Sequence, residues 1–305
     1  MIGDWTAAAV RARSTSARRL GTGGADAVAR RSDLASAIEA LGTSLYASRV
    51  ATSDDLAAAQ RDVKRAVLWE LRVLAGWMPP AGTRLARALA AVFEYEDLVA
   101  VVDALERGVQ APPRYDLGAL ATVSAGVWEA ASPAAIRADL RHGVWGDPGA
   151  EPSAMADVLA ASLLRRIASA APATASWATG ALALRAARIR VVEGRQPPDR
   201  FVALSRAVLG EAWVARRELA GLRAALPPSG AAPLTGVDDP AQLWRAEQGW
   251  RSRAESDGFR LLRDRGLGPE TAVGAFAVLW SDALRVAEAL AAADAGGGEL
   301  LDVVA

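Results

Sequence analysis

The chain has 305 residues, of which 52% are hydrophobic, so it can bury one large core or two ordinary ones. Its 35 basic residues balance its 35 acidic residues, and no overall field points to a nucleic-acid or membrane-surface partner. It has no cysteine, which excludes disulfides, thiol catalysis and thiolate metal sites and predicts a reducing compartment.

The amino-terminal quarter is predicted to form three helices. Asp33, or Ser32 before it, can cap the second helix, and Asp54-Asp55 opens the third. Apolar residues line one face of the third helix, which places Glu70 on its wet side. Gly21–Gly24 is expected to form a flexible break. The expected helices cover, approximately, residues 5–20, 33–41 and 56–75.

A long apolar helix follows, and the rest of the chain is organised around it. Gly108 can adopt the left-handed conformation that closes a helix, and Pro112-Pro113 prevent the helix from restarting. Glu94, Asp97 and most other charged residues of this stretch fall off the apolar stripe. The stripe itself recurs at steps of three and four, the spacing of one helix face: Leu85, Leu89, Val92, Tyr95, Val99, Val102 and Leu105.

This arrangement of a helix closed by glycine recurs later in the chain. Residues 194–201 repeat the glycine and the paired prolines of residues 108–115, again after an apolar helical run. A third run, over residues 276–290, ends in Gly296-Gly297-Gly298 and lacks the prolines. The pattern indicates a threefold helical repeat.

The remaining elements are also helical. Ser132-Pro133 combines a cap with a proline in the first turn. Residues 227–240 lack periodicity and are the expected mobile or boundary segment. No run alternates in the manner of a strand, so the predicted fold class is all-α. Helices are expected near residues 117–131, 133–141, 153–169, 198–209, 211–226 and 240–266, and from residue 268 onward.

Two helical enzyme classes lack their required residues. Terpene synthases hold magnesium with carboxylates one helical turn apart, but the acid pairs at 54–55 and 238–239 are followed at that spacing by Ala58 and Gln242. Di-iron bundles need paired histidines, whereas His142 is the only histidine.

Two weaker candidate sites keep an alternative interpretation. His142 could bind a metal together with Asp147, although a solitary imidazole beside glycines more often packs a loop. Glu94 and Asp97, at i and i+3, could form an acid–base couple or a divalent-cation site. The favoured interpretation of this second pair is a solvated or partner-facing side of an amphipathic helix.

Neither the apolar runs nor the amino-terminal segment predicts a membrane-spanning helix. The longest apolar run, Ala272 to Trp280, is far shorter than the ~20 residues that a spanning helix requires. The arginine- and serine-rich start has the composition of a transit peptide, but its helical pattern continues into the body of the chain without a cleavage-like break.

Three segments carry a resemblance to a known family. The opening Trp5–Arg13 is similar to the aromatic-x-x-Ala-Arg-Val-Arg start of the C-type subunit of the A/V-type ATP synthases, which is related to the d-type subunit of the vacuolar ATPase. Leu41–Tyr46 resembles that family's Leu-x-x-Thr-x-Tyr segment. The family's Arg-x-Asp-x-x-Asn-Leu positions are occupied here by Val92, Glu94, Asp97 and Leu98.

The resemblance implies three pseudo-threefold-related helical bundles that form a funnel. Their expected bounds are residues 1–117, 118–205 and 206–305. The protein would then be a non-catalytic central-stalk subunit of a rotary ATPase or synthase, without a cofactor or catalytic residues of its own. It would pass rotation driven by ion flow from the membrane proteolipid ring to the central shaft.

The expected partners are therefore the proteolipid ring and the shaft subunits, with the protein peripheral on the cytoplasmic face of the plasma membrane. The alternative function is a helical adaptor or regulatory protein that binds a partner helix or peptide in a groove; a helical enzyme with an unfamiliar site is the third. The candidate partner contacts are charged residues expected off the core stripes: Arg11, Arg13, Glu94, Asp97, Asp282 and Arg285.

Overall fold

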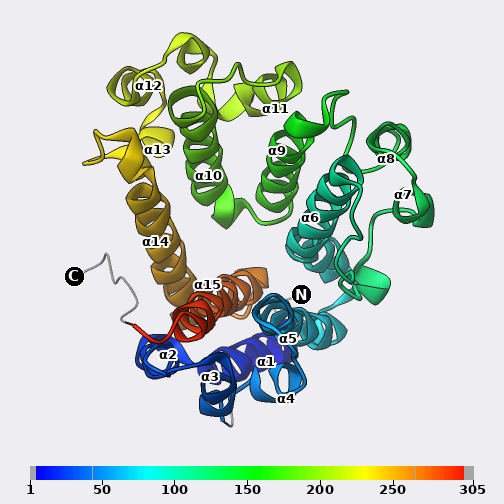
Figure 1. Cartoon of the computed structure of the whole chain (residues 1–305), viewed down its shortest axis with the longest axis vertical. Helices are drawn as coiled ribbons and strands as arrows, with labels where there is room; N and C mark the ends of the chain where they lie inside the picture. The colour runs from blue at the N-terminus through cyan, green and yellow to red at the C-terminus, as the bar shows by residue number, and fades with distance from the viewer. Residues whose placement is uncertain (1–4, 43, 265, 299–305) are drawn as a thin grey trace. The chain divides into compact units, whose positions relative to one another are not determined.

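A computed structural model describes residues 5–42, 44–264 and 266–298, and every regular element in these ranges is helical, which confirms the all-α class (Figure 1). The helices are α1 (Thr6–Ala17), α2 (Gly21–Ala29), α3 (Leu34–Ala40), α4 (Ala47–Val50), α5 (Leu56–Trp77), α6 (Thr83–Arg107), α7 (Ala125–Glu129), α8 (Pro133–Leu140), α9 (Pro152–Ala170), α10 (Ala175–Ala187), α11 (Asp199–Leu209), α12 (Leu219–Ala225), α13 (Pro228–Ala231), α14 (Leu243–Arg263) and α15 (Pro269–Asp294).

The chain divides into two compact units. The first unit comprises the described residues of Met1–Ala86 and Arg251–Ala305, and the second unit is Arg87–Trp250. The chain passes from one unit to the other within α6 and again within α14. The division into three consecutive repeats, with bounds at 117 and 205, stays a prediction.

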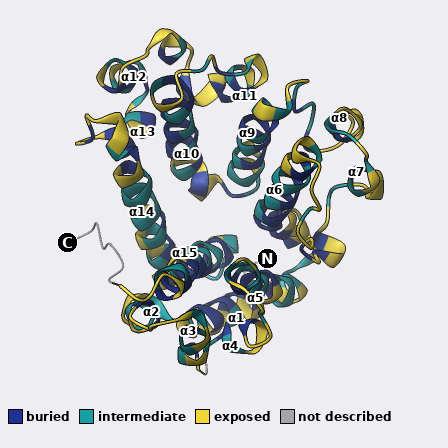
Figure 2. Cartoon of the chain, in the orientation of Figure 1, coloured by how far each residue is buried: buried dark blue, intermediate teal, exposed yellow. Residues whose placement is uncertain are grey.

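The first unit is built around its last helix. Helix α15 contacts α1, α2, α3 and α5, and the sides of these helices that face one another are buried (Figure 2). Val278, Val286 and Leu290 of α15 are fully buried, as is Val63 of α5. Burial of each such side chain contributes about 1.5 to 3 kcal/mol, so α15 supplies much of the core of this unit.

A close approach of two backbones joins α15 to the end of α14 inside the first unit. A β-carbon added to Gly274 would lie 2.6 Å from the carbonyl oxygen of Gly258. One added to Gly258 would lie 3.1 Å from the carbonyl oxygen of Gly274. The two helices therefore cross at a point where only glycine fits without displacement of the backbone.

The second unit has two hydrophobic clusters. One cluster gathers residues of α9, α10, α11 and the turns that follow, and Phe201 and Trp213 meet in it edge to face with ring centres 6.0 Å apart. The other joins α6 to α7, α8 and α9 and includes Leu98, Ile136 and Met155. Helix α9 contributes to both clusters and therefore links them.

Local signals placed several helix starts correctly. The carboxylate of Asp33 accepts the N–H of Ser36 at 2.8 Å, and that of Asp55 accepts the N–H of Ala58 at 2.7 Å, as predicted for capping residues. Ser132 caps α8, whose first residue is Pro133.

Other expectations were wrong because tertiary contacts override local preference. Gly21–Gly24 forms the first turn of α2 and not a flexible break, and the N–H groups at its start are bound by Asp282. The helix expected over 117–131 is reduced to a 3₁₀ turn and the short α7. The segment 227–240 contains α13 and a further 3₁₀ turn, with Leu234 fully buried.

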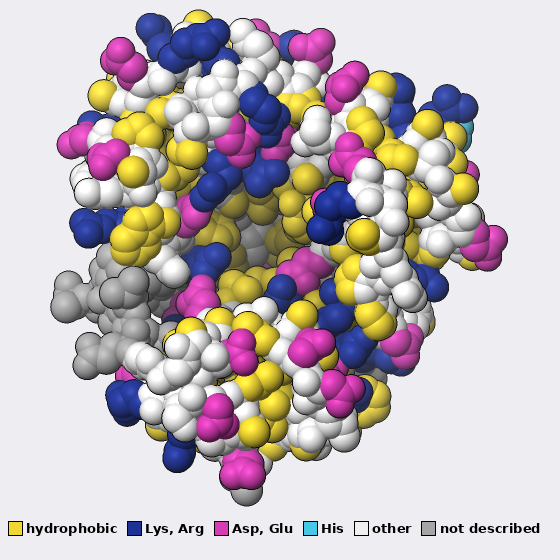
Figure 3. All heavy atoms as spheres, in the orientation of Figure 1, with side chains coloured by type: hydrophobic (Ala, Val, Ile, Leu, Met, Phe, Trp, Pro, Cys, Tyr) yellow, Lys and Arg dark blue, Asp and Glu magenta, His cyan; other side chains and the backbone are white. Residues whose placement is uncertain are grey.

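The described helices contain no segment that is long and apolar enough to cross a membrane. Acidic and basic side chains are interspersed over the face drawn in Figure 3, in keeping with the balanced composition.

Candidate functional site

The three glycine-closed helices predicted from the sequence end in related ways. Gly108, Gly194 and Gly296 all have positive φ, of 64°, 64° and 102°. At the ends of α6 and α15, the N–H of the residue after this glycine donates to the carbonyl oxygen five residues before it. The bonds run from Val109 to Ala104 and from Gly297 to Ala292, both at 3.0 Å. This is the bond of a Schellman ending. In the middle helix the corresponding bond, from the N–H of Arg195 to the carbonyl oxygen of Ile189, spans six residues, because the last turn, Arg188–Val192, is a π-helix.

Glu94 lies inside the second unit and binds the segment that follows α6. Its side chain is 1% exposed, and it accepts the backbone N–H groups of Thr122 and Val123, the second at 2.9 Å. The indole N–H of Trp145 donates to the same carboxylate at 3.2 Å. Arg166 stacks 4.6 Å from the Trp145 ring, and a guanidinium nitrogen of Arg166 lies 3.9 Å from the carboxylate.

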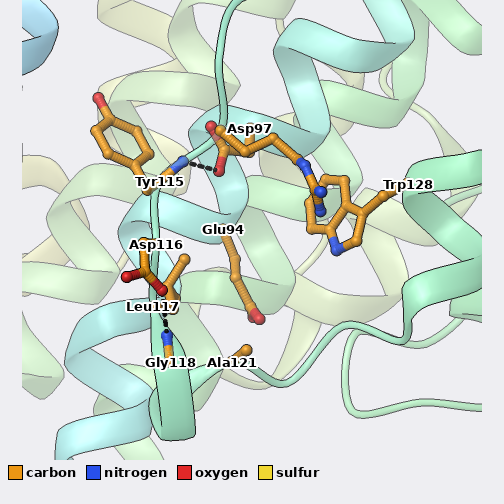
Figure 4. Close-up of a pocket in the computed structure, with 9 residues that line it drawn as sticks. Glu94, Asp97, Tyr115, Asp116, Leu117, Gly118, Ala121 and Trp128 are labelled. Carbon is orange, nitrogen blue, oxygen red and sulfur yellow. Dashed lines mark hydrogen bonds between the residues drawn. The ribbon is translucent and has the colours of Figure 1, made fainter.

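Asp97, one turn further along α6, helps to line a pocket of about 520 Å³ in the same unit. Figure 4 shows its carboxylate accepting the backbone N–H of Tyr115, at 2.8 Å. The Tyr115 hydroxyl donates to Glu96 at 2.9 Å, and its ring meets Phe93 edge to face. The pocket is walled by Trp128, against which the guanidinium of Arg114 stacks at 4.9 Å.

Asp282 occupies a comparable position in the first unit. It is fully buried on α15 and accepts the N–H groups of Leu20 and Gly21, both at 2.8 Å. The Tyr46 hydroxyl donates to it at 2.8 Å. Burial, and then the negative charge of Asp282, raise the pKa of Tyr46 well above its usual value. The carboxylate also favours the start of α2, where helix N–H groups lack internal partners.

Glu94 and Asp282 therefore form the same arrangement, which we call the carboxylate clamp: a buried carboxylate that accepts two consecutive backbone N–H groups and one aromatic side-chain donor. Each carboxylate residue precedes the glycine that closes its helix by 14 residues, Glu94 before Gly108 and Asp282 before Gly296. The equivalent position of the middle helix is Gly180, where an added β-carbon would meet the indole of Trp250 at 2.9 Å. The clamp is therefore present in the first and third of the three runs and absent from the second.

The structure revises the placement of three of the six candidate contacts. Glu94, Asp97 and Asp282 are buried, so the expectation that they lie off the packed faces is wrong. Each of them binds backbone groups of its own unit, which compensates for burial of the charge. Their contact with a partner stays a prediction.

The three candidate arginines also have internal partners. Arg285 contacts Asp282 at 3.5 Å and Glu255 at 2.5 Å. Arg13 donates to three carbonyl oxygens at the end of α14 and just after it, those of Leu262, Asp264 and Gly266, at 3.0, 2.7 and 3.1 Å. Arg11 is paired with a buried acid, described next. Of the six candidates, Glu94 and Asp97 line one pocket and Asp282 meets Arg285.

Two buried acids were not identified from the sequence. Glu70 of α5 is 7% exposed and is held by Arg11 and Arg18, each at 3.4 Å, so its placement on a wet helix face was wrong. Asp157 of α9 is fully buried and binds Arg185 and also Arg195, the latter at 2.8 Å. Glu70 stands between the large apolar residues Trp69 and Leu71, a signal that Asp157, between Ala156 and Val158, lacks.

His142 and Asp147, the possible metal-binding pair, each bind an arginine. His142 is exposed, and its Nε2 accepts a hydrogen bond from the Nε–H of Arg141 at 2.8 Å. Asp147 is bound by both ends of the Arg137 guanidinium, at 2.7 and 3.0 Å, which lowers the pKa of Asp147. In residues 5–42, 44–264 and 266–298, no three acidic or histidine side chains gather into a group that could hold a metal ion.

Chemically, the clamps serve to fix the backbone. The oxygens of Glu94 and of Asp282 already accept several protein hydrogen bonds, and both carboxylates are shielded from water. Such charge-assisted bonds are about twice as strong as neutral ones and hold a loop or helix start in one position. No protein-family model matches the chain, and no curated protein sequence matches it.

Proposed function

We propose that this protein is the central-stalk subunit of a rotary A/V-type ATPase or synthase, which couples the membrane proteolipid ring to the central shaft and performs no reaction of its own. The observation that supports this most is the repetition of the carboxylate clamp and of the glycine-closed helix end. The resemblance of the opening segments to the C-type subunit implies a protein built from related helical bundles. Related bundles would share local geometry, and the two clamps and the similar helix ends are such shared features.

The use of the buried charges also favours a mechanical role. Glu70, Glu94, Asp157 and Asp282 tie helices or loops to one another within their units. A part that transmits torque needs its elements held in fixed positions, and buried ion pairs with several hydrogen bonds supply directional restraint that apolar contacts alone lack. We propose that three such bundles form the funnel and that it lies peripherally on the cytoplasmic face of the plasma membrane.

The direct test is purification from the source membranes. A tagged chain should retain the proteolipid ring and the shaft subunits after detergent extraction, and deletion of its gene should release the nucleotide-binding head and its ATPase activity into the soluble fraction. Restoring the wild-type gene should return that activity to the membrane. If the tagged chain retains neither ring nor shaft, and deletion leaves the head on the membrane, the proposal is wrong.

The second candidate is a helical adaptor, and the pocket of about 520 Å³ beside α6 favours it. A peptide side chain could enter beside Asp97 and Trp128, which line the pocket together. The same purification separates the two functions, because an adaptor would retain a soluble partner in the absence of any membrane subunit.

A further inference from the structure

Two exposed tryptophans lie on α5 in the first unit. Among the described residues three tryptophans are exposed, and two of them, Trp69 and Trp77, belong to α5, with exposed fractions of 48% and 53%. The half-buried Val73 stands between them at intervals of four residues, and side chains four residues apart form a continuous ridge on a helix. We call these three residues the tryptophan ridge. Adjoining apolar side chains that are exposed and bordered by polar residues mark interaction sites.

Arginines border the tryptophan ridge. The guanidinium group of Arg49, from α4, lies 5.2 Å from the centre of the Trp69 ring, and that of Arg72 lies 5.9 Å from it. Helix α4 packs against α5, so contacts within the first unit place both charges at the ridge (Figure 1). A guanidinium group over an indole keeps its full charge, and its N–H groups lie in its own plane rather than toward the ring.

The chain around and after the ridge lacks negative charge. Residues 71–86 contain no aspartate or glutamate, whereas Arg72 and Arg84 are basic. The turn that follows Trp77 holds two prolines and is exposed at Pro80. The surface therefore combines apolar side chains with positive charge, and this stretch of the chain offers no acid that would repel an anion.

We propose that the tryptophan ridge and its arginines bind the surface of an anionic lipid bilayer. Anionic headgroups complement the positive charge of Arg49 and Arg72. Indole rings favour the boundary between headgroups and acyl chains, where Trp69 and Trp77 would lie. An uncharged apolar partner would match the rings but not the arginines.

Single-stranded nucleic acid is the other polyanion that tryptophan and arginine side chains can bind. It stacks its bases on open aromatic faces, but two guanidinium groups already lie close to the ring of Trp69. The geometry therefore favours a lipid surface. The inference does not rest on the rotary function, because lipid vesicles contain neither proteolipid ring nor shaft.

The test mixes the purified full-length chain with vesicles of phosphatidylcholine alone or of equal parts phosphatidylcholine and phosphatidylglycerol. The fraction of protein that sediments with the vesicles is measured against lipid concentration, at low and at high salt. We expect binding to the anionic vesicles only, and weaker binding at high salt because salt screens the attraction. Lipids brominated on their acyl chains should quench the fluorescence of the wild type more than that of a variant carrying both Trp69→Phe and Trp77→Phe.

Single substitutions assign the binding to this surface. Trp77→Ala should weaken binding to the anionic vesicles about tenfold, because an indole ring is lost from the bilayer interface. Arg49→Ala should weaken it about fivefold at low salt, the effect of one positive charge at an anionic surface. Trp244→Ala is the matched control, because Trp244 is an exposed tryptophan of the second unit with the guanidinium group of Arg245 5.4 Å from its ring.

The proposal is overturned if the wild type does not sediment with anionic vesicles or binds phosphatidylcholine vesicles equally well. It is also overturned if Trp77→Ala and Trp244→Ala bind alike, or if a single-stranded oligonucleotide binds and the vesicles do not. Trp77 and Arg49 are both exposed, so if one variant fails to fold the other still decides the question. Purification from membranes tests the rotary function separately, and each proposal can fail without the other.

Discussion

Replacing Asp282 with alanine should destabilise the first unit more than any other single change of an acid in it. The change removes the acceptor of three hydrogen bonds, each of 2.8 Å, from Leu20, Gly21 and Tyr46, and leaves Arg285 without one of its two acids. Breaking a buried charged network by removing one partner costs about 3 to 5 kcal/mol. Asp282→Asn keeps one acceptor oxygen and should cost about half as much.

Urea unfolding followed by tryptophan fluorescence and circular dichroism measures the loss, and hydrogen exchange locates it. The amides of Leu20 and Gly21 should exchange faster in the variant, because they lose their acceptor. Asp54→Ala is the matched control, since Asp54 is exposed and its removal should change the free energy of unfolding by less than about 0.5 kcal/mol. If Asp282→Ala unfolds like the Asp54 variant, the clamp does not stabilise the unit.

Three further changes test other contacts. Gly274→Ala should cost about 1 to 3 kcal/mol in urea unfolding, because its β-carbon would lie 2.6 Å from the carbonyl oxygen of Gly258. Glu94→Ala should cost about 3 to 5 kcal/mol and speed amide exchange in residues 122–123, whereas unchanged exchange there would contradict the second clamp. The pKa of Tyr46 is raised in the folded protein, so the contribution of Tyr46 to stability is present below the usual tyrosine pKa and is lost as the pH rises above that value. Between pH 8 and about pH 11 the free energy of unfolding of Tyr46→Phe should therefore fall by less than that of the wild type.

Helix positions could be predicted from the sequence because periodicity, caps and closing glycines are local signals. Asp33, Asp55 and Ser132 cap their helices as expected, and Gly108 closes α6 with positive φ. The start of α2 could not be predicted in this way. Its glycines are poor helix formers, and the carboxylate that binds its first N–H groups comes from α15, at the other end of the sequence.

The clamp formed by Glu94 could not be predicted because the buried residues of α6 are not confined to one face of the helix. Phe93 and Leu98 are fully buried although they lie off the predicted apolar stripe, so both sides of this helix pack against other elements. On such a helix a charged residue carries no information about exposure. Glu94 was therefore assigned to a solvated side, whereas its true environment depends on Thr122, Val123 and Trp145, which spacing along α6 cannot reveal.

The central position of α15 in the first unit has a consequence for biosynthesis. Helices α1, α2, α3 and α5 leave the ribosome before α15, the helix that covers their apolar sides, has been translated. The second unit is complete in the nascent chain well before that moment. During translation these earlier helices therefore expose apolar surface that is buried in the folded unit, and we expect chaperones to bind them until α15 has been synthesised.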